Sequence, residues 1–380
     1  MSRIPVFAPR LGAEEIEAAL ACLRSGAISG SGGREIERFE AEWAGYCGRR
    51  FGVAVVNGSA ALDLALDVLD LPAGSEVILP TFTIVSCLTA VLRAGATPVL
   101  VDSDPATGCM DVAKVERRIT ARTGAILAVH IYGHPVDMDP LLALAARHGL
   151  VIVEDAAEAH GAEYLVGHGG EESAWRRCGG FGELSTFSFY ANKPITTGEG
   201  GMVLADDEAL VARLRSRRNL GFGRGRRFLH EELGWNFRLS NLLAAIGRAQ
   251  VAKIAEVVRR KRELAAEYAR RLEGIEVLEL PRERAWARSI YWMYAVVVRD
   301  EAPCDAAELA ARLDRAGIET RPFFLGMHEQ PALHERGLFA GERYPVAERL
   351  ARRGLYLPSG LDLTAAELDR VADELVRALR

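Results

Sequence analysis

The sequence predicts an α/β protein with a mostly parallel central sheet and a smaller C-terminal α/β domain. Between residues 51 and 205, short apolar runs alternate with segments of helical spacing, which is the order of repeated β-α-β units. The pattern then changes to one long helix, expected over 240–272, that links a large domain to a small one. The 380 residues of the chain are enough for two such domains.

We expect the large domain, with an N-terminal helical segment, over residues 1–250 and the small domain over residues 251–380. The apolar spacing of Ile16, Leu20 and Leu23 predicts that the first helix is amphipathic. The expected strands are 53–56, 77–80, 98–102, 125–130, 150–154, 185–189, 201–205 and 290–298. The expected helices are 12–25, 35–47, 60–69, 84–94, 140–148, 207–218, 240–272, 306–316 and the segment after Thr364, a typical N-cap.

The composition is that of a globular protein, with 49% apolar and 26% charged residues. A net charge of −5 gives no support for binding nucleic acid or an anionic membrane. No apolar run reaches the roughly 18 residues of a spanning helix, and the first residues lack the apolar core of a signal peptide. Six scattered cysteines without a C-x-x-C pair predict reduced thiols in a cytoplasmic protein, with no zinc site.

The candidate chemistry centres on Lys193, in the segment S-T-F-S-F-Y-A-N-K-P-I-T-T-G-E-G-G at 185–201. A lysine that loses its charge near neutral pH can attack a carbonyl and form a Schiff base, which an arginine cannot do. Desolvation by Phe187, Phe189 and Tyr190 would lower the pKa of this amine. Taken alone, the segment fits a surface lysine before a glycine turn equally well. The chain has three other lysines, which are Lys114, Lys253 and Lys261.

Two predicted strand ends carry further chemistry, because ligands in parallel sheets bind at the carboxyl ends of the strands. Asp155 ends the apolar strand V-I-V-E-D, where a carboxylate is costly without a partner; a protonated ring nitrogen would be one, and a local cap is the alternative. Asn57, Gly58 and Ser59 lead from a strand into a helix. Their exposed N–H groups would cradle a phosphate, although Asn-Gly-Ser is also an ordinary cap and turn.

Each of two glycine-rich loops can be interpreted in two ways. The segment G-A-I-S-G-S-G-G at 26–33 is either a flexible linker or a loop that contacts a ligand. The segment G-F-G-R-G-R-R at 221–227 is either a solvated turn or an anion-binding loop.

The chain resembles the DegT-type nucleotide-sugar aminotransferases in the motifs E-D-A-A-E-A-H-G, S-T-F-S-F-Y-A-N-K, T-T-G-E-G-G-M-V and G-W-N-F-R-L-S-N. The resemblance covers nearly the whole chain, from I-P-V-F-A-P-R-L-G at 4 to L-Y-L-P-S-G at 355. It implies pyridoxal 5'-phosphate (PLP) as cofactor and the fold of aspartate aminotransferase, PLP fold type I. The chain looks most like the GDP-perosamine synthases in Glu158 and in the motifs H-I-Y-G-H-P and Y-W-M-Y. Those enzymes aminate carbon 4 of GDP-4-keto-6-deoxymannose with L-glutamate, and the family serves polysaccharide routes such as O-antigen synthesis.

The resemblance assigns roles around the cofactor ring. It makes Lys193 the Schiff-base lysine and proton shuttle, and it makes Asp155 the partner that keeps the pyridine nitrogen protonated. Glu158 would lie beside the phenolic oxygen of the ring. Phe82 would stack on one face of the ring and Ala157 would pack on the other.

The resemblance also assigns the cofactor phosphate and the substrate. Ser188 and the backbone of Gly58 and Ser59 would hold the phosphate. Asn236 would reach the phosphate of the neighbouring subunit's cofactor, which implies a homodimer with two shared sites, with pairing into a tetramer left open. Three residues would lie towards the sugar nucleotide: Gly30, Ser31 and His328.

Three features depart from the family pattern. Pro194 directly follows the lysine and biases Lys193 towards extended backbone. Where the family usually has Gly-Asp, this chain has Gly182-Glu183. The stretch Val166 to Arg177 is longer than the usual short turn, and we expect a surface insertion that could also cover or extend the site.

Several alternatives remain at this point. The same chemistry could act on another keto sugar, linked to UDP or dTDP, or on an octulosonate. A sugar dehydratase of the family would carry a histidine in place of Lys193. A non-catalytic regulatory protein on the same fold would not need Lys193, Asp155, Ser188 and Asn236 together. A nucleotide triphosphatase would need G-x-x-x-x-G-K-[ST], which T-T-G-E-G-G does not match.

Overall fold

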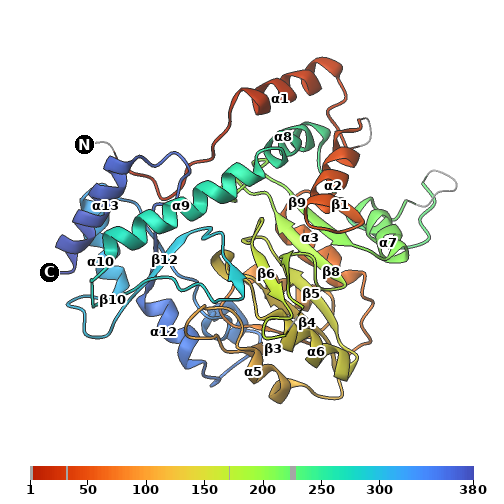
Figure 1. Ribbon diagram of the computed structural model, residues 1–380. Helices are drawn as coiled ribbons and strands as arrows, with labels where there is room; N and C mark the ends of the chain where they lie inside the picture. Colours follow the sequence, from red (N-terminus) through yellow and green to blue (C-terminus); the bar gives the residue numbers. More distant parts are fainter. Residues whose placement is uncertain (1–2, 31–32, 171, 223–227) are drawn as a thin grey trace.

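The computed structural model describes residues 3–30, 33–170, 172–222 and 228–380. Its centre is a seven-stranded sheet of order β1-β9-β8-β5-β4-β2-β3 (Figure 1). The strands β8, β5, β4, β2 and β3 are parallel to one another, and β9 runs antiparallel between β1 and β8. The strands are β1 Phe51–Val55, β2 Glu76–Pro80, β3 Thr97–Val101, β4 Thr123–Val129, β5 Val151–Asp155, β8 Leu184–Ser188 and β9 Gly201–Ala205. This confirms the predicted α/β fold with a mostly parallel sheet.

The crossover helices begin where the sequence places a cap. Asn57 and Asp207 are the N-caps of α3 and α7, and each side chain accepts a bond from a backbone N–H of the first turn. Helix α3 packs against β8 and β9, so its N-terminus lies at the carboxyl end of β8. The helices of this unit are α3 Gly58–Asp67, α4 Val85–Arg93, α5 Val112–Val115, α6 Met138–His148 and α7 Glu208–Arg218.

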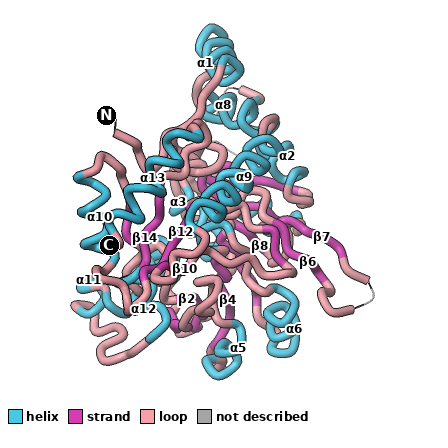
Figure 2. The backbone as a smooth tube through the Cα atoms, turned by 60° about the vertical axis from the view of Figure 1, so that its left-hand side comes forward, coloured by secondary structure: helices cyan, strands magenta, loops and turns pink. Residues whose placement is uncertain are grey.

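A second hydrophobic core lies around a four-stranded sheet of order β10-β12-β14-β13. In Figure 2, strands β12 and β14 run beside helices α10 and α13. Ile4 also packs in this core and pairs with Ile318, so we propose that the small domain takes in the first described residues as well. The elements are β10 Leu278–Glu279, β12 Tyr294–Val298, α10 Ala306–Arg315, β13 Arg321–Pro322, α11 Pro331–His334, α12 Pro345–Arg353, β14 Gly354–Leu357 and α13 Ala365–Ala378.

The single helix expected over 240–272 is wrong, because the chain forms two helices, α8 Asn241–Val251 and α9 Ile254–Leu272. Lys253 leaves the helical region at the break, with φ −103° and ψ 1°. Its ammonium lies 2.8 Å from the Glu14 carboxylate and 2.9 Å from that of Glu15. Helix α8 therefore packs with the N-terminal helices, and α9 continues to the second core.

The N-terminal helix α1, Ala13–Ser25, forms where expected, and α2 follows at Glu35–Tyr46. The apolar spacing of α1 nevertheless does not identify the face of this helix that is buried. Ile16 and Leu23 are exposed, whereas Glu15 and Cys22 are buried. Glu15 is buried because Gln250 and Lys253 bind its carboxylate.

The longer stretch from Val166 to Arg177 belongs to a β-hairpin. Its strands β6, Glu163–Val166, and β7, Ala174–Arg177, form a small sheet with β11, Ala287–Arg288. The guanidinium of Arg288 lies 3.9 Å from the ring centre of Trp175.

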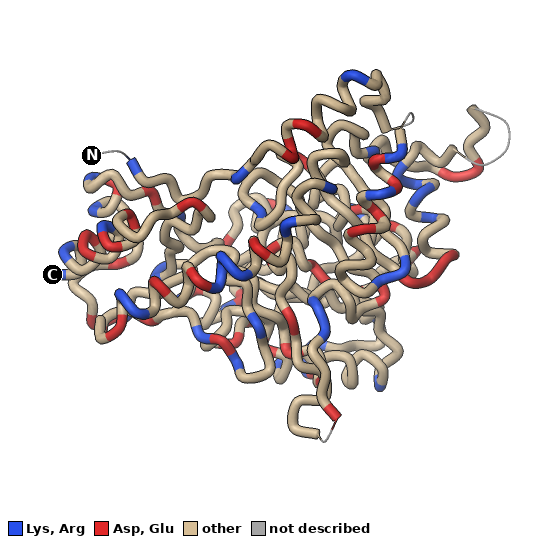
Figure 3. The backbone as a smooth tube through the Cα atoms, turned by 45° about the horizontal axis from the view of Figure 1, so that its top comes forward, with Lys and Arg blue, Asp and Glu red and all other residues tan. Residues whose placement is uncertain are grey.

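The arginines of α7 are paired rather than free. Arg217 binds Asp67, Asp70 and Glu232, and Arg218 binds Glu40. Basic and acidic residues are interspersed along the rest of the backbone (Figure 3). Of the loop at 221–227, only Gly221 and Phe222 are within the described residues. Across the described ranges, the helices are too short or too polar to span a lipid bilayer.

Candidate active site

A pocket of about 410 Å³ lies at the carboxyl ends of β5 and β8 and at the N-terminus of α3. This is the edge at which ligands bind parallel sheets. It brings together seven of the residues that the sequence assigned to the cofactor: Gly58, Ser59, Asp155, Ala157, Glu158, Ser188 and Lys193.

Lys193 projects into this pocket from the turn after β8, where its backbone N–H donates to the Tyr190 carbonyl at 2.9 Å. Its side chain is buried, and Nζ lies 3.7 Å from Oε1 of Glu158 and 3.9 Å from the ring centre of Trp292. Burial lowers the pKa of this amine, and the carboxylates of Glu158 and Asp155 oppose that shift. The amine is therefore biased towards the neutral, nucleophilic form, which rules out the surface-lysine interpretation.

Glu158 shares the pocket with Lys193 and is itself buried. Its Oε2 accepts a hydrogen bond from the backbone N–H of Tyr132 at 2.8 Å. Burial raises the pKa of this carboxyl to about 7, although the Lys193 ammonium acts in the opposite direction. The side chain can therefore hold or release a proton near neutral pH.

Asp155 closes β5, and both of its carboxylate oxygens are engaged. Oδ1 accepts from the Ala157 backbone N–H at 3.0 Å, which is the contact that the local-cap interpretation expects. Oδ2 accepts from the Cys87 thiol of α4 at 3.1 Å. Burial raises the pKa of Cys87 well above its usual range, so the thiol keeps its proton and remains a donor. The carboxylate both caps its turn and faces the pocket.

The opposite end of the pocket is built from backbone N–H groups and hydroxyls. Helix α3 begins there, and the Ser59 and Ser86 hydroxyls lie 2.7 Å apart. Ser188 lies so close that a Cβ on Gly58 would meet the Ser188 Cβ at 2.7 Å. Position 58 is therefore held to glycine by the approach of α3 to β8. N–H groups at a helix start and neighbouring hydroxyls are suited to bind a phosphate.

The remaining predicted residues that the structure describes do not line this pocket. Phe82 is buried in an aromatic cluster with Tyr132, Phe323 and Phe324, next to Thr83, which does line it. The other positions are as follows. Asn236 is exposed and pairs with Asn219. Gly30 is exposed, and Ser31 lies outside the described residues. His328 is buried and contacts Thr81 at 2.8 Å and Glu348 at 3.3 Å.

Comparison with known proteins decides the family. The model of the DegT/DnrJ/EryC1/StrS aminotransferase family matches residues 9–376. The chain belongs to this family. It is 39% identical over 380 residues to GDP-perosamine synthase of Caulobacter vibrioides, covering 100% of this chain and 99% of the relative. It is 40% identical over 348 residues to dTDP-3-amino-3,4,6-trideoxy-alpha-D-glucose transaminase of Streptomyces venezuelae, covering 90% of this chain and 86% of the relative.

Among solved structures, S. venezuelae DesV in complex with a ketimine intermediate is similar over 100% of both chains, with a TM-score of 0.89 and 38% identity. These matches confirm the resemblance drawn from the motifs and the fold that it implied. The chain is an aminotransferase.

The pocket of this aminotransferase also contains residues that the sequence analysis did not assign. Trp292, Tyr356 and Phe324 form a wall contributed by segments far from Lys193 in sequence. The Y-W-M-Y motif marked Trp292 as part of the resemblance, but its contact with Lys193 arises only from the fold. Asn192 lines the pocket too, and its buried side-chain oxygen has no hydrogen-bond partner among the described residues.

These residues fit pyridoxal phosphate. The pocket offers a desolvated amine at Lys193, a carboxylate at Asp155 for a ring nitrogen, and a phosphate site at α3. The unpaired oxygen of Asn192 shows that the pocket keeps polar capacity for a ligand. Its volume of about 410 Å³ is within the usual range for a small-molecule site.

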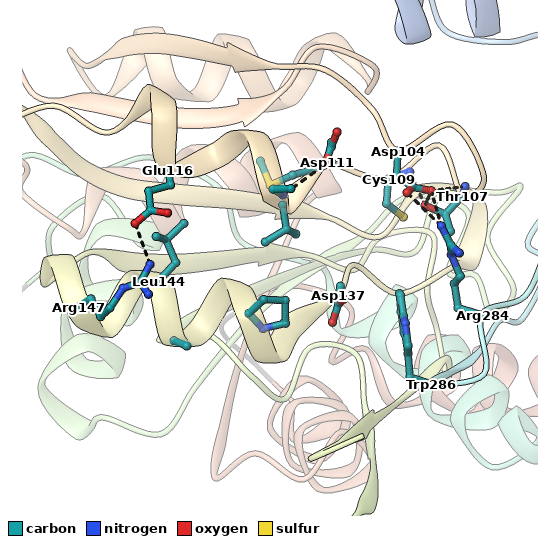
Figure 4. A pocket seen from close by; sticks show the side chains of 15 residues that line it. Asp104, Thr107, Cys109, Asp111, Glu116, Asp137, Leu144, Arg147, Arg284 and Trp286 are labelled. Atoms are coloured by element: carbon teal, nitrogen blue, oxygen red, sulfur yellow. Dashed lines mark hydrogen bonds and ion pairs between the residues drawn. The ribbon is translucent and has the colours of Figure 1, made fainter. Parts of the chain in front are cut away.

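A larger cavity of about 700 Å³ lies elsewhere, between α6 and the segments around Asp104 and Trp286 (Figure 4). Its charged groups are paired within the protein. Arg284 binds Asp104 at 3.1 Å, and Arg147 binds Glu116 at 2.9 Å. The described residues of the hairpin β6–β7 line neither this cavity nor the pocket of Lys193. Size alone therefore does not locate the chemistry of the aminotransferase.

Proposed function

We propose that this aminotransferase binds PLP on Lys193 and transfers the amino group of L-glutamate to carbon 4 of a nucleotide-linked 4-keto-6-deoxy sugar, GDP-4-keto-6-deoxymannose. One observation carries the chemistry: the buried Lys193 amine lies 3.7 Å from Glu158 in a pocket that also holds Asp155. The full-length similarity to GDP-perosamine synthase and the motifs around Glu158 and Trp292 support the sugar.

The bound cofactor supplies an electron sink for the negative charge that develops on the carbon next to nitrogen. Lys193 would hold the cofactor, and its amine, once freed by the incoming amino group, would accept the proton of that carbon at Nζ. Asp155 keeps the ring nitrogen protonated by its opposite charge, and Cys87 and the Ala157 N–H fix the orientation of its carboxylate. Glu158 can share a proton with the phenolic oxygen, because its pKa is near 7.

The phosphate is assigned to the start of α3, with Ser59, Ser86 and Ser188 as side-chain partners. Phe82 keeps its proposed place on a ring face only if the aromatic cluster moves, whereas Ala157 already lines the pocket. We retain Gly30, Ser31 and His328 as proposed contacts towards the nucleotide.

The active unit is proposed to be a homodimer that shares two sites, with the tetramer left open. Asn236 does not reach the pocket of its own chain, which suits a role in the partner's site. Exposed apolar side chains precede it in the sequence: Leu229, Leu233, which is 92% exposed, and Trp235. Burial of such side chains in a subunit contact would be favourable. A reducing compartment, the cytoplasm, suits the six unpaired and buried cysteines.

The experiment that tests the function pairs the purified enzyme with L-glutamate and a panel of keto-sugar nucleotides. The panel contains GDP-4-keto-6-deoxymannose and 4-keto and 3-keto sugars linked to dTDP or UDP. Product mass identifies amination. The proposal expects the highest kcat/KM with the GDP sugar. A dTDP- or UDP-linked sugar used at least about tenfold better would replace the proposed substrate and leave the reaction class intact.

A further inference from the structure

Lys261, on helix α9, is a buried lysine outside the pocket of Lys193. Only 1% of its surface is exposed. Its ammonium donates to the Trp292 carbonyl at 2.7 Å and to the Ser359 carbonyl at 2.6 Å. Burial lowers the pKa of this amine to about 7, and the two carbonyls accept its hydrogen bonds in either protonation state. An apolar side chain in the same space would leave both carbonyls without this donor, so the lysine joins the two segments that carry them.

Trp292, the first acceptor of Lys261, lies under the reacting amine. Its ring centre is 3.9 Å from Nζ of Lys193, and its indole N–H donates to the carbonyl of Asn192, the residue before Lys193, at 2.7 Å. Its backbone N–H donates to the Tyr132 carbonyl at 3.0 Å. With the bond from Lys261, every polar group of Trp292 is therefore engaged.

The second acceptor, Ser359, follows β14, the strand that brings Tyr356 to the pocket. The Ser359 hydroxyl accepts from the Tyr294 backbone N–H at 2.9 Å, at the start of β12. Lys261 thus ties together the two segments that carry Trp292 and Tyr356, at the point where both leave the small sheet.

We propose that Lys261 is a positioning residue for the amine of Lys193, acting through Trp292. One ammonium fixes the backbone of Trp292 from α9, and the Trp292 ring then sets the place and the solvent exclusion of Nζ in Lys193. The inference rests on the proposed role of Lys193 as the reacting amine. It means that Lys261, a residue of the second domain, helps to orient the Lys193 amine.

The test reads the pH dependence of Lys193 itself in the protein without cofactor or substrate. Reductive methylation with formaldehyde, mapped by peptide mass, resolves the lysines because there are only four, and exposed Lys114 is the internal reference. The charged or titratable groups with the largest electrostatic interaction with Lys193 are Glu158, Asp155 and Cys87, and His160 also feels its charge. None of them is altered in the variants below.

In Lys261→Met, the midpoint of Lys193 labelling is expected to move to higher pH by at least about half a unit. Burial is the main cause of the lowered pKa of Lys193, so water admitted by a displaced Trp292 reverses it. With cofactor and glutamate, kcat falls at least about tenfold with little change in KM. Because the labelling needs no substrate, failure of the sugar assignment would leave this result untouched.

The matched control is Tyr268→Phe. Tyr268 lies on the same helix, and its hydroxyl donates to the Pro358 carbonyl at 2.8 Å, in the same loop as Ser359, rather than to Trp292. This variant should lose stability and keep the wild-type labelling midpoint. An equal shift in both variants, or no shift in folded Lys261→Met, would overturn the proposal.

A second variant keeps the test decisive if Lys261→Met does not fold. Trp292→Phe retains the backbone carbonyl that Lys261 binds and removes the indole N–H that binds Asn192. It is expected to raise the Lys193 midpoint. Where Lys261→Met does fold, the combined variant is expected to show no further rise. An unchanged midpoint in Trp292→Phe would show that the ring does not transmit the effect, and the proposal would be wrong.

Discussion

Glu158 and Lys193 form a buried ion pair, with 3.7 Å between Oε1 of the carboxylate and Nζ of the amine. Burial raises the pKa of Glu158 to about 7 and lowers the pKa of Lys193. Desolvation thus drives both groups towards neutrality, while their attraction opposes it. The pair is the feature around which the site can be tested.

Replacement of Glu158 with glutamine should make Lys193 more reactive above about pH 7, where the wild-type carboxyl carries its charge. The carboxylate stabilises the ammonium, so its loss lowers the pKa of Lys193 further and moves the midpoint of its methylation to lower pH. Below about pH 7 the wild-type carboxyl is itself protonated, so the two proteins should converge there. Glu163→Gln, in the hairpin ion pair with Arg288, is the control. A midpoint that moves upward would contradict the assigned pair.

Replacement of Asp155 with asparagine isolates the charge that we propose lies opposite the ring nitrogen. Asparagine keeps the shape and can keep the contact with the Ala157 N–H. We expect single-turnover rates with glutamate, normalised to bound cofactor, to fall at least about a hundredfold, which is about 2.7 kcal/mol. A loss under about fivefold would favour a role limited to capping the turn.

Replacement of Gly58 with alanine should weaken cofactor binding. The new Cβ would meet the Ser188 Cβ at 2.7 Å, so the start of α3 must move away from the phosphate site. We expect the Kd for PLP to rise at least about tenfold in equilibrium titrations. Gly45→Ala, in α2, is the control because its Cβ enters open space and should leave the Kd unchanged. An unchanged Kd in the Gly58 variant would move the phosphate elsewhere.

Mixtures of two inactive variants test the shared site. Asn236→Ala and Lys193→Ala, mixed and allowed to exchange subunits, place both lesions in one site of a mixed dimer and leave the other intact. We expect up to about a quarter of wild-type activity at equal amounts. If no mixture exceeds the more active parent, Asn236 does not act in the partner's site.

The sequence predicted the parts of the site that depend on local sequence patterns. Asp155 at the end of an apolar strand, Asn57 before a helix and Lys193 after a strand each follow from patterns within a few residues. The parallel sheet then brings those strand ends to one edge. Fold class and pocket were therefore predictable from period and order along the chain.

Long-range contacts were not predictable in this way. The wall formed by Trp292 and Tyr356 depends on how the small sheet meets the large one. Lys253 breaks a continuous helical pattern because Glu14 and Glu15, over 200 residues away, bind its ammonium. The apolar spacing of α1 predicted the helix, but buried Glu15 shows that a distant pairing decided which face packs. Two-residue strands such as β10 and β13 are too short to show an alternating apolar pattern in the sequence.

The most direct test of the account is borohydride reduction of the enzyme reconstituted with PLP, followed by peptide mapping. We expect the covalent attachment on Lys193, because this amine is desolvated and lies between Glu158 and the Trp292 ring. The predicted result is loss of the visible absorption band and a phosphopyridoxyl mass on the peptide that contains Lys193, and its absence in Lys193→Ala. Attachment at Lys114, Lys253 or Lys261, or a folded wild-type enzyme that takes up no cofactor, would contradict it.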